Sequence, residues 1–357
     1  MKTIPAVFAV ADEYQIIVNT RENVFVWVEV NGKKYYDESN GIMRSWSKAH
    51  RVNVPMEELD KAEKYIVFTE KIIERKPYFS VMGEVESESF GFRPVPKKGA
   101  RAFHIADAHN DSERPVMAAK AAGEIDFLIL NGDIPNDSGD VENFSTVYEI
   151  AAQITGGNIP IVFARGNHDM RGIYAEKFAD YTPSHNGKTY YTFRLGSIWG
   201  IALDCGEDKD DSHEEYGGTV CCHTFRERET AFLEKVISDA EKEYLSEGVE
   251  TRIVVVHNPF TRKYQPPFDI EEDIYTKWAK LLKENIKPDV MICGHVHKIS
   301  VDRPGGDRDG FGQPCTVVCA THKSKDRYEG TLFTFGESEI KAEFYSDSGE
   351  KTGEAVI

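Results

Sequence analysis

Short apolar runs that alternate with stretches of helical spacing constrain the fold of this chain more than any other feature. They begin near residue 100 and recur through most of the remaining sequence of 357 residues. Five runs have the length and composition of buried strands: 102–106, 127–130, 159–164, 253–256 and 290–293. Buried strands interspersed with helices predict stacked β-sheets flanked by helices, which is an α/β architecture.

The stretches between these runs supply the helices and a hairpin. Apolar residues recur at helical spacing in 226–242, and further helices are expected at 114–123 and 274–285. Residues 190–203 predict a hairpin, because two β-prone runs flank a glycine-containing turn. The tail from 315 to 344 is again rich in β-prone residues, so we expect strands there as well.

The N-terminal part predicts a different, all-β unit. Asn31-Gly32 separates two β-prone runs, and this pair signals a hairpin because a type I′ turn needs positive φ at both central residues. Tyr65 starts a later run and is placed like the tyrosine corner of immunoglobulin-like sandwiches. We therefore expect a small fibronectin-III-like β-sandwich at 1–95. A linker with two prolines and a glycine would join it to a second domain at 100–357.

Polar side chains cluster where the five buried strands of the second domain end. In open α/β sheets, ligands bind outside the carboxyl ends of the strands, so these segments are expected to converge. The segments are Asp107-Ala108-His109, Gly132-Asp133, Gly166-Asn167-His168-Asp169, His257-Asn258-Pro259 and Gly294-His295-Val296-His297. Each segment alone is a weak signal, because polar residues often cap strands and loops. Their joint occurrence in this order is a specific one.

The side chains expected to converge form a mixed set of oxygen and imidazole donors. Its members are Asp107, His109, Asp133, Asn167, His257, His295 and His297. Such a set suits Mn²⁺, Fe or Zn²⁺ and suits Ca²⁺ or Mg²⁺ poorly, because the latter cations prefer oxygen ligands. These ligands are too many for one ion, so the set predicts two ions that share a carboxylate. Asp133 lies in the middle of the set and is the expected bridge.

This ordered set resembles the calcineurin-like metallophosphoesterase superfamily, over residues 100 to 300. The resemblance implies a four-layer α/β/β/α sandwich. It also implies that Asp107, His109 and His297 hold one metal, that Asn167, His257 and His295 hold the other, and that Asp133 bridges them. His168 would then be a catalytic residue beside the substrate. Asp169 would orient it, or another acid would if the adjacency of the two residues prevents that contact.

An all-β part ahead of such a domain is similar to the layout of purple acid phosphatases. Those enzymes carry a metal-binding tyrosine three residues after the bridging aspartate, and Asn136 stands at that position here. We therefore do not expect a purple Fe(III) centre, although the dinuclear site itself is unaffected by this difference.

The neighbours of the ligand set include candidate substrate contacts. Arg171 is expected to bind a phosphate oxygen or a diester substituent, because a guanidinium donates paired hydrogen bonds to such groups. A surface arginine is the alternative. Asn167 is expected to contact the substrate as well as the metal. The acidic loop at 206–224 is expected to decide which substrate is accepted.

Other suggestive residues have simpler interpretations. We expect His104 to be a hydrogen-bonded core histidine and Arg165 to be structural. His322 follows a strand and is interpreted as a loop histidine, with an approach to the substrate as the alternative. Adjacent Cys221 and Cys222 lack the usual spacing of zinc ligands, so a zinc site there is not expected.

The constellation predicts a dinuclear metallophosphoesterase that cleaves phosphomonoesters or phosphodiesters. Two metal ions that share a carboxylate lower the pKa of a water molecule, so that hydroxide can attack phosphorus near neutral pH. His168 is expected to protonate the leaving oxygen or to donate a hydrogen bond to the phosphoryl group. A hydrolase of pyrophosphate bonds in nucleotide or lipid diphosphates is the alternative, and a catalytically silent scaffold is the alternative of another class.

Bulk properties limit the partners of such an enzyme. The formal net charge of −17 repels nucleic acid, so a small phosphate ester is the expected substrate. The six cysteines do not form a dense framework, which favours reduced thiols and a cytoplasmic location. No apolar run approaches the length of a membrane helix, and Met1 to Ala11 lacks the pattern of a signal peptide. The sequence leaves the oligomeric state open.

Overall fold

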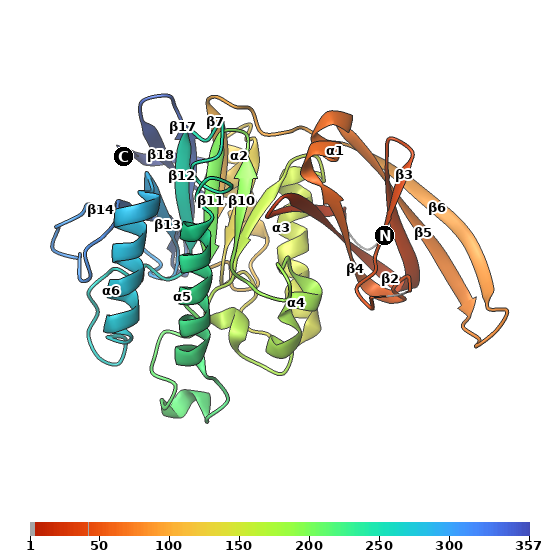
Figure 1. Ribbon diagram of the computed structural model, residues 1–357, viewed down its shortest axis with the longest axis horizontal. Helices are drawn as coiled ribbons and strands as arrows, with labels where there is room; N and C mark the ends of the chain where they lie inside the picture. Colours follow the sequence, from red (N-terminus) through yellow and green to blue (C-terminus); the bar gives the residue numbers. More distant parts are fainter. Residues whose placement is uncertain (1–3, 42) are drawn as a thin grey trace.

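The chain folds into two stacked β-sheets enclosed by helices, as the sequence predicts (Figure 1). The computed structural model describes residues 4–41 and 43–357. The larger sheet contains, in spatial order, β17 (Tyr328–Phe335), β7 (Ala100–Ile105), β8 (Phe127–Asn131), β9 (Ile161–Ala164) and β1 (Ala6–Val10). Because β7, β8 and β9 are parallel neighbours, their carboxyl ends lie at one edge of this sheet.

The smaller sheet faces the first one. Its strands, in spatial order, are β10 (Tyr191–Leu195), β11 (Ile198–Leu203), β12 (Thr251–Val256), β13 (Val290–Cys293), β15 (Thr316–Cys319) and β14 (Ser300–Asp302). The predicted hairpin is the antiparallel pair β10 and β11. The four strands from β11 to β15 in this order are parallel, so their carboxyl ends also share one edge.

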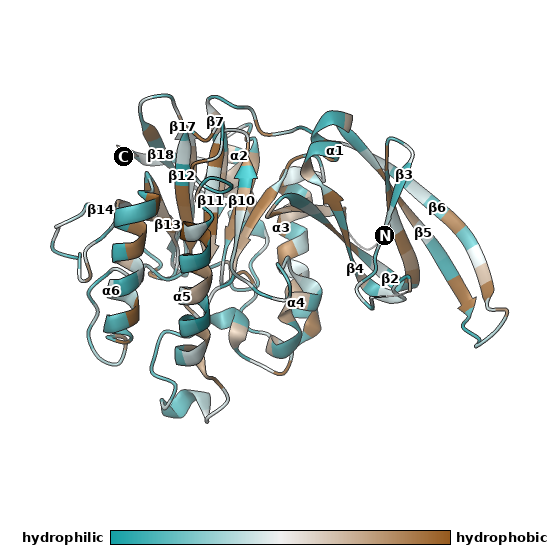
Figure 2. Cartoon of the chain, viewed as in Figure 1, coloured by the Kyte–Doolittle hydropathy of each residue, from teal (hydrophilic) through white to brown (hydrophobic). Residues whose placement is uncertain are grey.

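The alternation of side chains along β12 shows how the layers stack. Ile253 and Val255 belong to the main core between the two sheets, whereas Val254 and Val256 belong to a second core beneath helices α5 and α6. The helices are α2 (Glu113–Ala121) and α3 (Ser145–Thr155) on the larger sheet and α5 (Cys222–Ser238) and α6 (Glu272–Leu281) on the smaller one. The strands are largely hydrophobic and the outer helices are mixed (Figure 2). The predicted α/β/β/α order is confirmed.

The remaining elements complete the second part of the chain. They are α4 (Phe178–Tyr181), β16 (His322–Lys323), β18 (Ile340–Ser346), β19 (Lys351–Val356) and the turns of tight helix at Val141–Phe144, His168–Met170, Ala175–Lys177 and Glu214–Tyr216. The helix predicted at 274–285 begins at Glu272, and its last turn widens into a π-helix at Leu282–Ile286.

The N-terminal part is all-β apart from helix α1 (Met56–Ala62). Its strands are β2 (Glu13–Val30), β3 (Lys33–Tyr36), β4 (Ser47–Pro55), β5 (Lys64–Glu74) and β6 (Val81–Gly91). The predicted turn is confirmed, since Asn31 and Gly32 have φ angles of 48° and 80° and join β2 to β3. The strand before this turn is long, and its polar residues Arg21, Glu22 and Asn23 stay extended with exposed side chains.

Strand β1 connects this part to the rest of the molecule. It pairs antiparallel with β2 and parallel with β9, so the larger sheet continues from the second part into the first. This strand was not predicted from the sequence, because five apolar residues at 6–10 carry no signal of their distant partner. The division at residues 95–100 stays a prediction, and a deletion of 1–95 would remove a strand from the sheet that carries the site.

Tyr65 also links the two parts. Its hydroxyl donates a 2.8 Å hydrogen bond to the carbonyl of Gly157, which follows α3. The predicted tyrosine corner is therefore wrong, because that motif bonds to the backbone a few residues upstream, within its own sandwich. We expect Tyr65→Phe to lower the free energy of unfolding by about 1–3 kcal/mol, because a buried carbonyl loses its donor. Urea denaturation checks this, and an unchanged midpoint would contradict it.

Candidate metal centre

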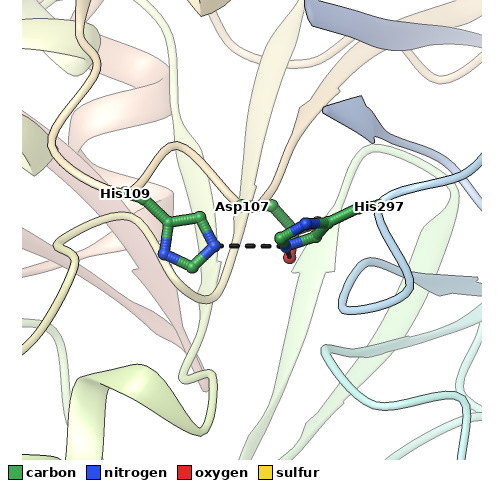
Figure 3. Close-up of side chains that lie close together, drawn as sticks. All are labelled: Asp107, His109 and His297. Carbon is green, nitrogen blue, oxygen red and sulfur yellow. Dashed lines mark hydrogen bonds and ion pairs between the residues drawn. The ribbon is translucent and has the colours of Figure 1, made fainter. Parts of the chain in front are cut away.

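The carboxyl ends of β7, β8 and β9 in one sheet meet those of β12 and β13 in the other. The predicted donor residues on these ends come together there. Ligand atoms of Asp107, His109 and His297 all lie within 4.8 Å of one another. Figure 3 shows these three side chains, with the Nε2 atoms of His109 and His297 only 3.2 Å apart. His297 Nε2 also lies 3.2 Å from Asp107 Oδ1.

A second group lies beside the first. Ligand atoms of Asp133, His257 and His295 again lie within 4.8 Å of one another. The Nε2 atom of His257 is 3.1 Å from Asp133 Oδ2 and 3.8 Å from Asp107 Oδ1, so this imidazole reaches the carboxylates of both groups. Asn167 Oδ1 lies 3.1 Å from His295 Nδ1 and thereby joins the second group.

The backbone at these positions is under strain. Asp107, His109, Asp133, His295 and His297 all have φ angles between 47° and 68°. Residues other than glycine rarely adopt this left-handed conformation, which costs on the order of 1 kcal/mol or more at each position. Five such residues at one place indicate that the surrounding structure holds these side chains in position for function.

Two glycines allow the strand ends to approach so closely. A Cβ atom at Gly166 would lie 2.2 Å from Asp133 Oδ1, and one at Gly132 would lie 2.6 Å from Gly166 Cα and from His257 Nδ1. Both distances are far below van der Waals contact. The glycines of the Gly-Asp and Gly-Asn-His-Asp segments are therefore required by the packing of the site itself.

The charges of the centre favour a bound cation. Burial opposes protonation of His257, yet the neighbouring Asp133 carboxylate raises the pKa of this imidazole to about 10. Burial acts to raise the pKa of Asp133, but the positive charge of His257 keeps the pKa of this carboxylate well below its usual value. Buried carboxylates that hold a proton on an imidazole would hold a metal ion in its place.

The donor atoms also fit a metal. His257 Nδ1 donates to the carbonyl of Asn131 at 2.6 Å, so its Nε2 is left to face the carboxylates. Among the residues that the structure describes, the buried His109 Nδ1 has no hydrogen-bond partner, and the buried His257 Nε2 faces the carboxylates of Asp133 and Asp107. Burial lowers the pKa of His109 and of His295 to about 4, so both imidazoles are neutral, as metal ligands must be.

His168 lies at the edge of this centre and is half-buried. Its Nδ1 donates to the carbonyl of Asn136 at 2.8 Å, and its ring stands 4.6 Å from the ring of His109. The prediction that Asp169 orients His168 is wrong: the orienting group is a backbone carbonyl. His168 can also form a group with His109 and Asp133 whose ligand atoms lie within 4.8 Å, so distance alone does not exclude it as a ligand.

Asp169 supports Asp133 instead. Its Oδ2 accepts hydrogen bonds from the backbone N–H groups of Gly166, at 2.7 Å, and of Asp133, at 3.2 Å. Burial, followed by the charge of Asp133, raises the pKa of Asp169 to about 8. Adjacent side chains of a helical turn point apart, which explains why Asp169 turns away from His168 and towards the strand ends.

The model of the calcineurin-like phosphoesterase family matches residues 100–299. The chain belongs to this family. A probable cyclic nucleotide phosphodiesterase of Rhodopseudomonas palustris (strain ATCC BAA-98 / CGA009) is 23% identical over 212 residues, which are 56% of this chain and 67% of that protein. The predicted family is thus confirmed, and with it a hydrolase of phosphoric esters.

Two solved structures share the fold. A purple acid phosphatase isolated from yellow lupin (Lupinus luteus) seeds is 14% identical with a TM-score of 0.60, and the match covers 99% of this chain and 74% of that chain. A dimetal phosphatase from Danio rerio is 12% identical with a TM-score of 0.50, and the match covers 73% of this chain and 99% of that chain. The first match includes the N-terminal β part, which the sequence likened to purple acid phosphatases.

In this phosphoesterase, Arg171 is anchored by an acid that the sequence analysis did not single out. Its guanidinium forms two hydrogen bonds of 2.9 Å to the carboxylate of Glu207, which is almost completely buried. It also lies 3.6 Å from Asp208 and 3.6 Å from Glu215, and its NH1 atom is 3.3 Å from His168 Nε2. Arg171 therefore ties the acidic loop to the edge of the centre, and its contact with substrate stays a prediction.

Breaking this pair is expected to destabilise the fold. In Arg171→Met, the buried Glu207 carboxylate loses its main partner, so the free energy of unfolding should fall by about 3–5 kcal/mol. Adding Glu207→Gln should restore part of this loss, because the uncompensated charge is removed. Urea denaturation of both single variants and the double variant measures the coupling, and additive effects would show that the pair is not coupled.

Lys323 is a second residue that the sequence analysis missed. It is half-buried on β16, and its ammonium group donates to the carbonyl of Ala108, between the ligand positions 107 and 109. The sequence feature that could have pointed to Lys323 is its position next to His322, which follows β15 at the same edge of the sheet. An approach to the substrate was the alternative interpretation of His322, and its neighbour Lys323 is the residue that contacts the ligand loop.

The residues interpreted as structural have partners outside the set of donor residues. His104 is fully buried, and its Nε2 lies 3.0 Å from Asn131 Nδ2. Arg165 forms an ion pair of 2.7 Å with Asp204. All six cysteines are free thiols, and Cys222 accepts from the backbone N–H of Glu207. In the described part of the chain, no helix is both long and apolar enough to cross a membrane.

Proposed function

We propose that this phosphoesterase uses two metal ions, from among Mn, Fe and Zn, to hydrolyse phosphomonoesters or phosphodiesters. Asp107, His109 and His297 would hold one ion, Asn167, His257 and His295 the other, and Asp133 both. The observation that carries the proposal is the pair of adjacent donor groups with buried carboxylates between them. Metal ions bound there would lower the pKa of a water nucleophile and offset the charge of the phosphoryl oxygens.

The protein's own residues position the metal ligands and the proton donor. The buried strand ends fix the donors before any ligand arrives, which avoids the cost of ordering them during the reaction. The carbonyl of Asn136 can only accept, so it fixes a proton on Nδ1 of His168, and Nε2, which lies 3.3 Å from the Arg171 guanidinium, is the nitrogen left to exchange a proton. In its protonated form, His168 would give the Nε2 proton to the leaving oxygen, and Asp169 would keep Asp133 in place.

Metal removal tests the proposal directly. Protein stripped with a chelator should lose turnover of p-nitrophenyl phosphate and bis-p-nitrophenyl phosphate, and added Mn²⁺ should restore it. Metal analysis of the restored protein should find about two ions per chain. The catalytically silent alternative predicts no turnover of any phosphate ester with any of the three metals, and stoichiometric binding of a single ion would reject the shared-carboxylate arrangement.

The same turnover assay can identify the substrate class. Because the bacterial relative is a probable cyclic nucleotide phosphodiesterase, 3′,5′-cyclic AMP is the first diester to test, and a nucleoside diphosphate tests the pyrophosphate alternative. A single phosphoryl group attached to an alcohol suits one pair of ions, and we therefore expect esters to be hydrolysed faster than diphosphates. The absence of nucleic-acid partners is part of this proposal and rests on the net charge of −17, and the absence of membrane partners rests on the lack of a long apolar run.

A further inference from the structure

A cavity of about 500 Å³ opens beside the second donor group. His295, a member of that group, forms part of its wall, and Asp208 of the acidic loop forms another part. Several of the other lining residues are aromatic: Phe260, Tyr264, Phe268, Tyr275 and Phe311. The volume lies in the range of pockets that hold small organic ligands. A group attached to a phosphate at the centre can therefore enter this cavity without a change of fold.

The aromatic rings of the cavity differ in how far they are exposed to a ligand. Phe260 and Tyr275 are buried and pack on each other with ring centroids 5.4 Å apart, so they form the floor. Phe311 lies 6.4 Å from Tyr275 and continues this layer outwards. Phe268 is 40% exposed on the loop that forms the rim, with the ammonium of Lys209 lying 5.2 Å from its ring centroid. A large ring exposed at the mouth of an aromatic cavity offers a stacking surface to a ligand.

The charges of the cavity disfavour a second phosphate. Asp208, Asp269, Glu272 and Asp309 all line it, and Arg262 and Lys263 are the basic residues among its described lining. Arg262 is already paired, at 3.3 Å, with Asp302. A polyphosphate chain would meet more carboxylates than cations here, whereas an uncharged flat ring would meet aromatic walls.

We propose that this cavity binds an uncharged aromatic or heteroaromatic substituent of the phosphate ester, such as a nucleobase, stacked on Phe268. The proposal rests on the phosphate-ester hydrolysis proposed above and narrows its substrate class to esters of aromatic or nucleoside alcohols. It also predicts that diphosphates are poorer substrates than these esters, because the second phosphate would face the acidic lining.

Binding without catalysis is the first test. Titration calorimetry measures the affinity of adenosine, which has no phosphate, for the whole protein with and without Mn²⁺. We expect Phe268→Ala to weaken binding about 10-fold or more, since stacking of a base on an aromatic ring contributes substantially to affinity. Phe268→Trp should keep the affinity. Phe79→Ala, at a position that is 95% exposed between β5 and β6, is the matched control and should change nothing. Absent binding, or binding that Phe268→Ala leaves intact, would overturn the proposal.

Turnover of paired substrates is the second test. Adenosine 5′-monophosphate and ribose 5-phosphate share the leaving alkoxide and the phosphate charge and differ in the base. For diesters, thymidine 5′-(p-nitrophenyl phosphate) and methyl p-nitrophenyl phosphate form a similar pair. We expect a higher kcat/KM for the nucleoside member of a pair and a loss of this preference in Phe268→Ala.

The two proposals fail in different ways. If no ester is hydrolysed but adenosine binds in a Phe268-dependent manner, the proposed function falls and the cavity assignment stands. If both members of a pair are hydrolysed with equal kcat/KM and Phe268→Ala leaves that equality unchanged, the cavity assignment falls and the proposed function stands. Faster turnover of adenosine diphosphate at its pyrophosphate bond than of the monophosphate ester would also overturn the cavity assignment.

Discussion

Replacing Asp133 by asparagine should reduce phosphate-ester hydrolysis by about 10³-fold or more and should lower the metal content of the protein. The carboxylate lies in the second donor group, 3.1 Å from His257, and is also within reach of His109 of the first. Asparagine keeps the shape of the side chain and one carbonyl oxygen but loses the charge. Metal ions contribute several kcal/mol of transition-state stabilisation, and each 1.4 kcal/mol corresponds to a factor of ten in rate.

The controls for Asp133→Asn separate chemistry from folding. Circular dichroism and the urea midpoint report whether the fold is intact, and the backbone bond from His168 to Oδ1 can persist in the variant. Asp180→Asn carries the same substitution at an exposed position of α4 and should retain metal and activity. A folded Asp133→Asn protein with the metal content and kcat of the parent would remove the basis of the proposed two-ion centre.

The convergence of the donors was predictable because it follows from sheet topology. Parallel strands bring their carboxyl ends to one edge, so Asp107, Asp133 and Asn167 were expected together from the order of strands alone. His257 and His295 follow parallel strands of the opposing sheet, and the stacking of the two sheets brings them to the same place. The convergence of the donors can therefore be predicted from short apolar runs and the residues that end them, without knowledge of distant contacts.

Contacts made by loops and by isolated strands were not predictable in this way. The pairing of Arg171 with Glu207 depends on the path of an acidic loop, which carries no periodicity to read. Strand β1 is too short to specify its partner β9, although it places the N-terminal part on the sheet of the centre. The orientation of His168 depends on a backbone carbonyl, and a backbone group leaves no trace in the sequence.

Replacing His168 by alanine should lower kcat by about 10²- to 10⁴-fold for esters of poor leaving groups, the range of general acid catalysis. His168 is half-buried beside the first donor group. Its Nδ1 donates to the carbonyl of Asn136 and its Nε2 lies 3.3 Å from the Arg171 guanidinium, so Nε2 is the nitrogen left to exchange a proton. The loss should be much smaller for p-nitrophenyl phosphate, because its leaving oxygen needs little protonation. That difference distinguishes proton donation from simple positioning of the substrate.

Metal content decides between the two roles that geometry allows for His168. If His168 only transfers a proton, the His168→Ala protein should bind as much Mn²⁺ as its parent, and the loss should grow with the basicity of the leaving alcohol. His185→Ala changes an exposed loop histidine and provides the control for the substitution itself. Lost metal with an equal rate decrease for all leaving groups would make His168 a ligand together with His109 and Asp133, the grouping that the distances also permit.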